Sequence, residues 1–324
     1  MRKIEINDEV RQIAKDYATN LFKNKDEKKF NFPLKGLKKL SDKLKAANQD
    51  EYAKYVDNIV SNYDSILLLE PNQFEDYKKK HFKNLKDNQL TDKVEGCLPK
   101  KSFYESVVAA MRYDEVQKSQ IRQFMKKLGI KACVYCNASY AVDTKDKKAT
   151  FQVDHFYPKS KYPFLCISFF NLQPACMHCN QIKSKSTKYE FGLYTLDKTK
   201  LDPFYFSIDD KSIIKYMLTN NSDELKFKLK STYNSIAADK HSDFFHIDGL
   251  YAQFTDAAEE VVWKSKIYNS AYREQMLAAF KSNFSYNMAD FKRFYLGFYP
   301  DKKDVNKRPL TLLMQGIAKD MGLE

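Results

Sequence analysis

Two C-x-x-C motifs constrain this chain more than any other feature of its sequence. The cysteines are Cys133, Cys136, Cys176 and Cys179, and 39 residues separate the two pairs. Thiolates at this spacing converge on one tetrahedral ion, as in structural Zn²⁺ sites. The interval is longer than in a compact zinc ribbon, which is ordinary when a functional loop is inserted between the knuckles. We therefore expect a four-cysteine zinc site that holds the two ends of an inserted segment together.

A thiol-redox function is the alternative interpretation of these cysteines. A redox C-x-x-C motif normally occurs once and precedes a helix in a βαβ unit, which is not the pattern here. His178 lies within the second knuckle, and we expect it to contact solvent or substrate rather than replace a thiol. Cys97 and Cys166 have no partner at a ligand spacing, so we expect buried, small hydrophobic side chains at both positions.

The rest of the chain is predicted to be mainly helical. Only 8 glycines and 9 prolines occur in 324 residues, which favours long helices and few tight turns. No apolar run approaches the roughly 18 residues that a membrane span needs. We expect a soluble, cytoplasmic protein without a membrane partner.

The chain is basic, with 55 lysines and arginines against 42 aspartates and glutamates. A basic excess attracts polyanions such as nucleic acids through the release of counterions. Many lysine-rich helical proteins bind no nucleic acid, so the charge alone does not decide the function.

Apolar periodicity predicts helices on both sides of the cysteine motifs. Before them we expect a helix capped by Asn7 or Asp8, a basic connection over 23–39, a helix from Asn48, a shorter one over 74–85 and a long helix from Ser102 to Gly129. After them we expect extended segments at 201–206, 212–218 and 224–230, forming a small hairpin. Further helices are expected at 251–270, around 272–280, at 291–299 and at 310–321. This pattern divides the chain into an N-terminal helical region (1–129), a core (130–206) and a C-terminal region (207–324).

A second group of polar residues lies between and beside the cysteine pairs. Phe151–Val153 is β-prone and leads into Asp154 and His155, and Pro158 then forces the chain out of regular structure. Asn171 follows 16 residues after His155, and Asn180 directly follows Cys179. Taken singly, each residue has a simple structural explanation: Asn180 can cap a helix, and Asn171 can form a turn.

Together, however, these residues resemble the HNH endonucleases. The match runs D-H-F-x-P-K-S and then N-L-x-P-x-C-x-x-C-N-x-x-K, with both cysteine pairs at the zinc-knuckle positions of that family. It covers about residues 126–206. The resemblance implies a ββα-metal core, in which a short hairpin and a helix hold one divalent cation. A narrower likeness is to HNH proteins that act as nuclease subunits beside an ATPase in Septu-type and retron anti-phage defence systems.

The resemblance also assigns roles to individual residues. His155 corresponds to the general base, and Asn171 to the asparagine that orders the loop holding it. Asp154 and Asn180 correspond to the ligands of the catalytic cation, for which oxygen donors suit Mg²⁺ or Mn²⁺. Asp154 and His155 are neighbours on an extended segment, so we expect their side chains to project to opposite sides and to converge through the bend at Pro158.

Phosphodiester hydrolysis explains these residue types without the family. A histidine can deprotonate water near neutral pH, and a cation can neutralise charge on the phosphate and on the leaving oxygen. Lys159 and Lys183 match the lysines of the motif, and we expect both to contact phosphate.

The resemblance thus implies a metal-dependent HNH endonuclease that cuts DNA, with an ATPase as its partner protein. A non-catalytic zinc-knuckle module that binds nucleic acid is one alternative, and an RNA-cleaving HNH nuclease is another. The presence of Asp154, His155 and Asn180 together favours catalysis, because a degenerate core has no need to keep all three residue types.

Overall fold

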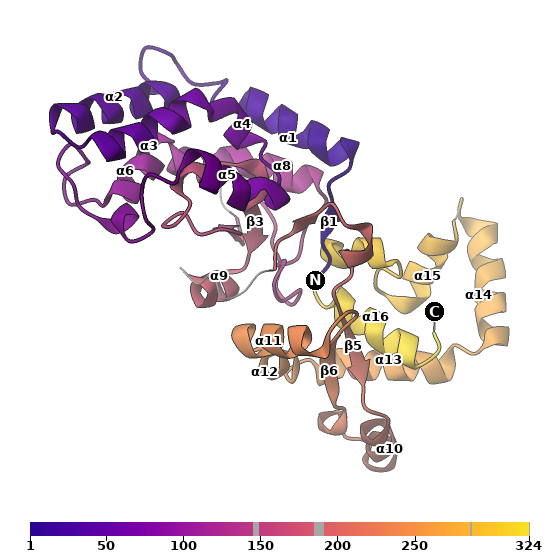
Figure 1. Ribbon diagram of the computed structural model, residues 1–324. Helices are drawn as coiled ribbons and strands as arrows, with labels where there is room; N and C mark the ends of the chain where they lie inside the picture. The colour runs from indigo at the N-terminus through magenta and orange to yellow at the C-terminus, as the bar shows by residue number, and fades with distance from the viewer. Residues whose placement is uncertain (145–148, 185–190, 286, 324) are drawn as a thin grey trace.

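The computed structural model describes residues 1–144, 149–184, 191–285 and 287–323. It is mainly helical with three two-stranded sheets, which confirms the predicted fold class. Figure 1 shows the N-terminal helices gathered in one half of the molecule and the C-terminal helices in the other. Hydrophobic residues from both halves and from the segment between them belong to one continuous core.

The N-terminal half consists of short helices joined by turns. They are α1 (Asp8–Asn20), α2 (Pro33–Ala46), α3 (Asp50–Ser61), α4 (Tyr63–Leu67), α5 (Phe74–His81), α6 (Phe103–Ala110), α7 (Tyr113–Glu115) and α8 (Ile121–Lys127), with a π-helical turn at Val116–Gln120.

Two of these helices begin where the sequence predicts. The side chain of Asn7 accepts a hydrogen bond of 2.9 Å from the Val10 amide and caps α1. Ser102 and Glu105 form a capping box at the start of α6. Tyr52 and Tyr55 are buried on α3 as core residues, as their helical spacing indicates.

Two predictions for this half are wrong in part. The basic segment 23–39 is not a connection throughout, because Pro33 opens α2 at a position where a missing N–H costs nothing. The single helix expected from Ser102 to Gly129 is broken at Arg112, which adopts a left-handed conformation (φ 58°). An apolar stripe continues through such a break, so periodicity alone does not reveal it. Gly129 ends α8 with a positive φ, as predicted.

The segment that holds the cysteine motifs folds as strand, strand, helix. Strands β2 (Gln152–His155) and β3 (Leu172–Ala175) pair antiparallel, with His155 opposite Leu172, and α9 (Met177–Lys183) follows. Strand β4 (Tyr194–Thr195) then pairs in parallel with β1 (Ile4–Glu5). The first residues of the chain are therefore tied to the segment that follows the cysteine motifs.

The C-terminal half contains the predicted hairpin and a set of helices. Its elements are β5 (Phe204–Ile208), α10 (Asp210–Thr219), β6 (Phe227–Ser231), α11 (Ser235–Phe245), α12 (Ile247–Tyr251), α13 (Thr255–Ile267), α14 (Ser270–Asn283), α15 (Met288–Leu296) and α16 (Thr311–Asp320).

The hairpin differs from the prediction in one segment. Strands β5 and β6 pair antiparallel as expected, but 212–218 is helical within α10 and not extended. Asp209 caps α10 by accepting a hydrogen bond from the Ser212 amide. This local signal for a helix outweighs the short apolar run that suggested a strand. Similarly, the helix expected over 251–270 begins only at Thr255. Among the described helices, none is long and apolar enough to cross a membrane.

Candidate metal centre and active-site cleft

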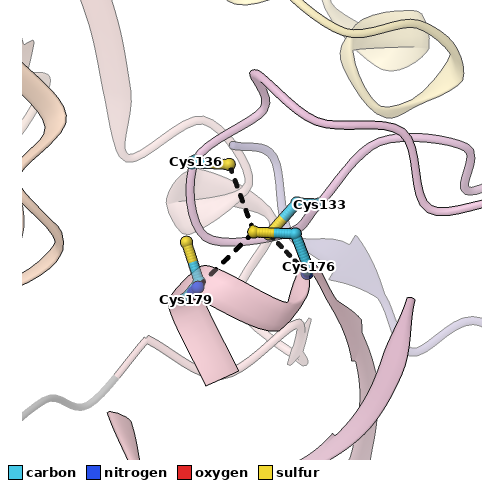
Figure 2. A group of neighbouring side chains, drawn as sticks. All are labelled: Cys133, Cys136, Cys176 and Cys179. Carbon is cyan, nitrogen blue, oxygen red and sulfur yellow. Dashed lines mark hydrogen bonds between the residues drawn. The ribbon is translucent and has the colours of Figure 1, made fainter. Parts of the chain in front are cut away.

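The four motif cysteines meet at one buried point (Figure 2). Their sulfur atoms all lie within 4.8 Å of one another, and the Sγ atoms of Cys136 and Cys176 are 4.0 Å apart. A tetrahedral Zn²⁺ with Zn–S bonds of about 2.3 Å places its sulfurs roughly 3.8 Å apart, so the cluster needs little contraction to accept the ion. The predicted zinc centre therefore has the donor set and the compactness that Zn²⁺ requires.

The local chain helps to hold the sulfurs in place. Two backbone amides donate hydrogen bonds to sulfur atoms of the cluster. The Cys176 amide donates to Cys133 Sγ at 3.2 Å, and the Ala138 amide donates to Cys136 Sγ at 3.4 Å. Hydrogen bonds among the thiols lower the pKa of Cys176 and Cys136, whereas burial raises the pKa of Cys133 and the neighbouring thiols raise that of Cys179. A depressed pKa favours the thiolate, which is the form that binds metal.

The cluster is built from two places in the sequence. Cys133 and Cys136 lie in the loop after α8, whereas Cys176 caps α9 and Cys179 lies on its first turn. Two groups from the C-terminal half bind this loop. Tyr251 donates to the Cys136 carbonyl at 2.7 Å, and a ring nitrogen of His241 lies 2.6 Å from the Tyr135 carbonyl. The site thus joins the two halves of the molecule.

Three of the four predicted catalytic residues lie beside this centre, around a cleft of about 410 Å³. Asp154, His155 and Asn180 line the cleft, and so does Lys159. The hairpin β2–β3 supplies the first two residues, α9 supplies Asn180, and the loop after β2 supplies Lys159. The structure therefore brings these four predicted residues together, although they span 27 positions of the sequence.

His155 is buried, with an exposed fraction of 6%. Its Nε2 lies 3.0 Å from the Cys166 carbonyl oxygen, which can only accept a hydrogen bond. This contact favours the tautomer with the proton on Nε2, so Nδ1 carries the lone pair. Burial, together with the charges of Lys159 and Lys183, lowers the pKa of His155 to about 3. The imidazole is therefore neutral at physiological pH, which is the state that a general base needs.

Asn171 holds the loop that follows His155. Its side-chain oxygen accepts from the Tyr157 amide at 2.7 Å, and its Nδ2 donates to the carbonyls of Tyr157 and Leu165, both at 3.1 Å. The side chain is completely buried. These three hydrogen bonds join the two ends of the Tyr157–Leu165 segment, which carries Pro158 and Lys159. Asn171 therefore ties this loop together through its side chain.

Asp154, the neighbour of His155 on β2, has different hydrogen-bond partners. Its Oδ2 accepts from the Tyr135 hydroxyl and lies 3.0 Å from the ammonium of Lys183. Gln173, opposite Asp154 in the hairpin, donates in turn to the Tyr135 hydroxyl. One carboxylate oxygen is thus engaged inside the protein, and among the described residues Oδ1 has no hydrogen-bond partner. Asn180 donates from Nδ2 to Gln152 Oε1 at 2.5 Å, which leaves its own amide oxygen as a donor atom for a cation.

Lys183 differs from the prediction. Instead of facing phosphate, its side chain is buried with 1% exposure, paired with Asp154 and donating to the His155 carbonyl. The helical turn that separates Lys183 from Cys179 points it into the protein, beneath the hairpin. Lys159, in contrast, is half-buried and lines the cleft. His178 is exposed, as expected, and the buried cluster holds the four cysteines alone.

The cleft also contains residues that sequence reasoning missed. Tyr104, Tyr113 and Gln117 form part of its wall, and all three come from the N-terminal helical region. These three residues lie outside the motif in the sequence. Tyrosines within an apolar stripe are also typical of a hydrophobic core, so the pattern does not point to a functional site. The break at Arg112, which turns Tyr113 toward the hairpin, leaves no signal in the sequence.

The fold and the site define a ββα unit in which the loop before β2 and the start of α9 bring together four cysteines as a candidate metal centre. Within the chain, 63 residues are 33% identical to the Septu protein PtuB of Bacillus thuringiensis. The matched segment is 19% of this chain and 23% of that protein, so the chain spans less than a quarter of the relative's length. No protein-family model matches the chain, and no solved structure matches it.

Proposed function

We propose that this protein is a metal-dependent HNH endonuclease that hydrolyses DNA phosphodiester bonds. The observation that carries the proposal is the placement of His155, which is neutral, tied through Nε2 to the Cys166 carbonyl and part of the wall of a cleft that also contains Asp154, Asn180 and Lys159. In this arrangement Nδ1 takes the proton of the attacking water.

Besides the four sulfurs that suit zinc, the site has oxygen atoms that suit a catalytic cation. Asp154 Oδ1 and the amide oxygen of Asn180 are hard oxygen donors on one cleft, a set that suits Mg²⁺ or Mn²⁺. Such an ion would supply charge neutralisation at the phosphate and at the leaving oxygen. Asn171 holds the Tyr157–Leu165 segment, and Lys159 binds the phosphate from that segment.

The charge of the chain supports a polyanionic substrate at this cleft. Residues 1–206 contain 38 lysines and arginines against 26 aspartates and glutamates, whereas residues 207–324 contain 17 against 16. The basic excess therefore belongs to the regions that form the cleft walls. Nucleic acids bind such surfaces through the release of counterions.

The similarity to a Septu protein supports a part in anti-phage defence. A nuclease of this kind works in the cytoplasm, beside an ATPase partner that restrains or activates it. Co-expression with the product of an adjacent ATPase gene, followed by co-purification, tests the partner. Recovery of the chain alone would count against it.

Cleavage of supercoiled plasmid tests the activity itself. The chain, loaded with zinc, is incubated with Mg²⁺ or Mn²⁺, and nicked or linear product is measured. We expect His155→Ala to lose about 10²- to 10⁴-fold in rate, the usual contribution of a general base. His178→Ala is the matched control, because His178 lies on the same unit but is exposed. Equal cleavage by wild type and His155→Ala would refute the proposal, and RNA in place of plasmid distinguishes the two substrates.

One observation favours a second candidate, a non-catalytic module that binds nucleic acid. The pairing of Asp154 with Lys183 places a positive charge next to a proposed cation ligand. If the wild type binds DNA in a gel-shift assay and neither metal produces cleavage, alone or with the ATPase, this candidate replaces the nuclease.

A further inference from the structure

From its contacts in the cleft, we infer that Tyr113 is a positioning residue that orients both His155 and Lys159. This inference rests on the proposed function, because it assigns Tyr113 a part in the same site. Tyr113 lies in the N-terminal helical region, 13 positions before the start of the segment that resembles the HNH core.

The side chain of Tyr113 contacts the hairpin at three points. Its ring centroid is 4.7 Å from that of His155, with the ring planes tilted by 48°. The ammonium of Lys159 lies 4.6 Å from the centre of the same ring. The hydroxyl donates to the Val153 carbonyl at 3.1 Å. With an exposed fraction of 2%, Tyr113 is a fixed part of the wall and not a mobile surface group.

The three contacts have different consequences for the site. The aromatic ring packs against the imidazole and restricts its rotation, so that Nε2 stays on the Cys166 carbonyl. The negative face of the ring attracts the Lys159 ammonium and holds it near the cleft. The hydroxyl anchors Tyr113 to the strand that carries His155. The proposed base, His155, and the proposed phosphate-binding residue, Lys159, are thus both positioned by Tyr113, which comes from another part of the chain.

The backbone around Tyr113 is irregular in a way that serves this placement. Arg112 is held in the left-handed region (φ 58°), an uncommon conformation for a residue with a side chain, and a π-helical turn follows at Val116–Gln120. The Arg112 guanidinium lies 4.7 Å from the centre of the Phe30 ring, which helps to secure the break. Irregularities of these two kinds are frequent at functional sites. Here they direct Tyr113 to His155 and place Gln117 in the cleft wall.

Two substitutions separate the ring from the hydroxyl. Tyr113→Phe keeps the ring and removes only the hydrogen bond to Val153, whereas Tyr113→Leu removes the ring. Tyr295 gives matched controls, because it is also buried and donates to a backbone carbonyl, that of Leu323, at 3.2 Å. It lies on α15, outside the residues that line the cleft. Zinc content and the thermal midpoint establish that each variant is folded.

The first measurement does not depend on catalysis. Long-range ¹H–¹⁵N NMR spectra of the imidazoles report the tautomer of His155, whose signals are assigned by their loss in His155→Ala. We expect the Nε2–H tautomer alone in wild type and Tyr113→Phe, and a mixture of tautomers in Tyr113→Leu. His155 signals that are unchanged in folded Tyr113→Leu would overturn the inference. The same change in Tyr295→Leu would also overturn it, because it would show a general loosening of the protein.

The second measurement uses plasmid cleavage. We expect kcat to fall about 10- to 100-fold in Tyr113→Leu, as for a misplaced catalytic group. KM should rise as well, since Lys159 loses its support, and Tyr113→Phe should restore both values to within about 3-fold of wild type. If wild type does not cleave, alone or with the ATPase, the proposed function fails while the NMR result still decides the part played by Tyr113. If wild type cleaves and Tyr113→Leu matches it, the inference alone fails.

Discussion

The ammonium of Lys183 lies 3.0 Å from Oδ2 of Asp154, and both side chains are almost completely buried. Their exposed fractions are 1% and 6%. Two charges in such a place are stable only as a pair, because the desolvation of each is offset by the other and by further hydrogen bonds. The Tyr135 hydroxyl on Asp154 and the His155 carbonyl on Lys183 supply those bonds. The pair therefore links α9 to the hairpin that carries His155.

Replacing Lys183 by methionine should destabilise the protein strongly. The substitution keeps most of the side-chain volume but leaves the Asp154 carboxylate buried without its cation, which typically costs about 3–5 kcal/mol. Urea unfolding of the zinc-loaded protein measures the change in the free energy of unfolding. Lys45→Met is the matched control, because Lys45 pairs with Asp57 at 2.8 Å with exposures of 52% and 45%. Such an exposed pair contributes about 0–1 kcal/mol. Equal losses in the two variants would show that burial does not matter here.

One zinc ion per chain should be found by elemental analysis, and removing it should unfold the site. Binding of structural zinc supplies about 10–16 kcal/mol in small zinc-binding domains, comparable to the entire stability of a typical protein. We expect a strong chelator, or Cys176→Ser, to lower the thermal midpoint and abolish zinc binding. Cys97→Ser should keep the full zinc content, because Cys97 lies outside the cluster. Zinc retained in Cys176→Ser would contradict the four-sulfur site.

Changing Asn171 should loosen the loop that carries Lys159. Asn171→Ala removes three hydrogen bonds worth about 1 kcal/mol each, and we expect a loss of roughly 2–4 kcal/mol in the free energy of unfolding. Asn171→Asp keeps the acceptor for the Tyr157 amide but turns an oxygen toward the carbonyls of Tyr157 and Leu165. It should therefore be no better than alanine, despite its similar shape. Hydrogen exchange at the Tyr157 amide measures the local effect, and protection that survives both changes would argue against this function of Asn171.

Acid should weaken the contact between the two halves through His241. This histidine is completely buried, and burial lowers its pKa from 6.5 to about 3. Between these two values the unfolded chain binds a proton that the folded chain does not. His241 therefore makes its full contribution to the free energy of unfolding above pH 6.5. This contribution falls as the pH drops toward 3, by about 1.4 kcal/mol per pH unit for one such group.

His241→Gln tests this dependence on pH. A glutamine amide can donate to the Tyr135 carbonyl but does not titrate, so its unfolding free energy should fall less steeply with acid than that of wild type. Acid also protonates the zinc-binding thiolates, but this effect is common to both proteins and is removed by taking their difference. Parallel pH profiles between pH 4 and 6.5 would show that His241 is not the group responsible.

Sequence patterns were sufficient where a residue type, its spacing or a helix cap carries the information. The spacing of the cysteines predicts a cluster of four sulfurs, and the structure brings these atoms within 4.8 Å of one another. The β-prone run before Asp154 predicts a strand, and caps such as Asn7 mark where helices begin. Asn171 was also singled out from the sequence by its resemblance to a motif, and the structure shows it hydrogen-bonded to both ends of the Tyr157–Leu165 segment.

What the sequence did not determine depends on contacts between distant segments. Lys183 looks like a phosphate-binding lysine in sequence, yet the packing of α9 under the hairpin buries it against Asp154. Tyr113 lies outside the motif and was not singled out from the sequence, yet the fold packs it against His155 across 42 positions of the chain. Short-range patterns report on neighbours along the chain, whereas burial and pairing depend on which helix packs over which strand. The cysteine spacing alone thus predicts the cluster of four sulfurs, but only the tertiary structure decides which residues surround His155.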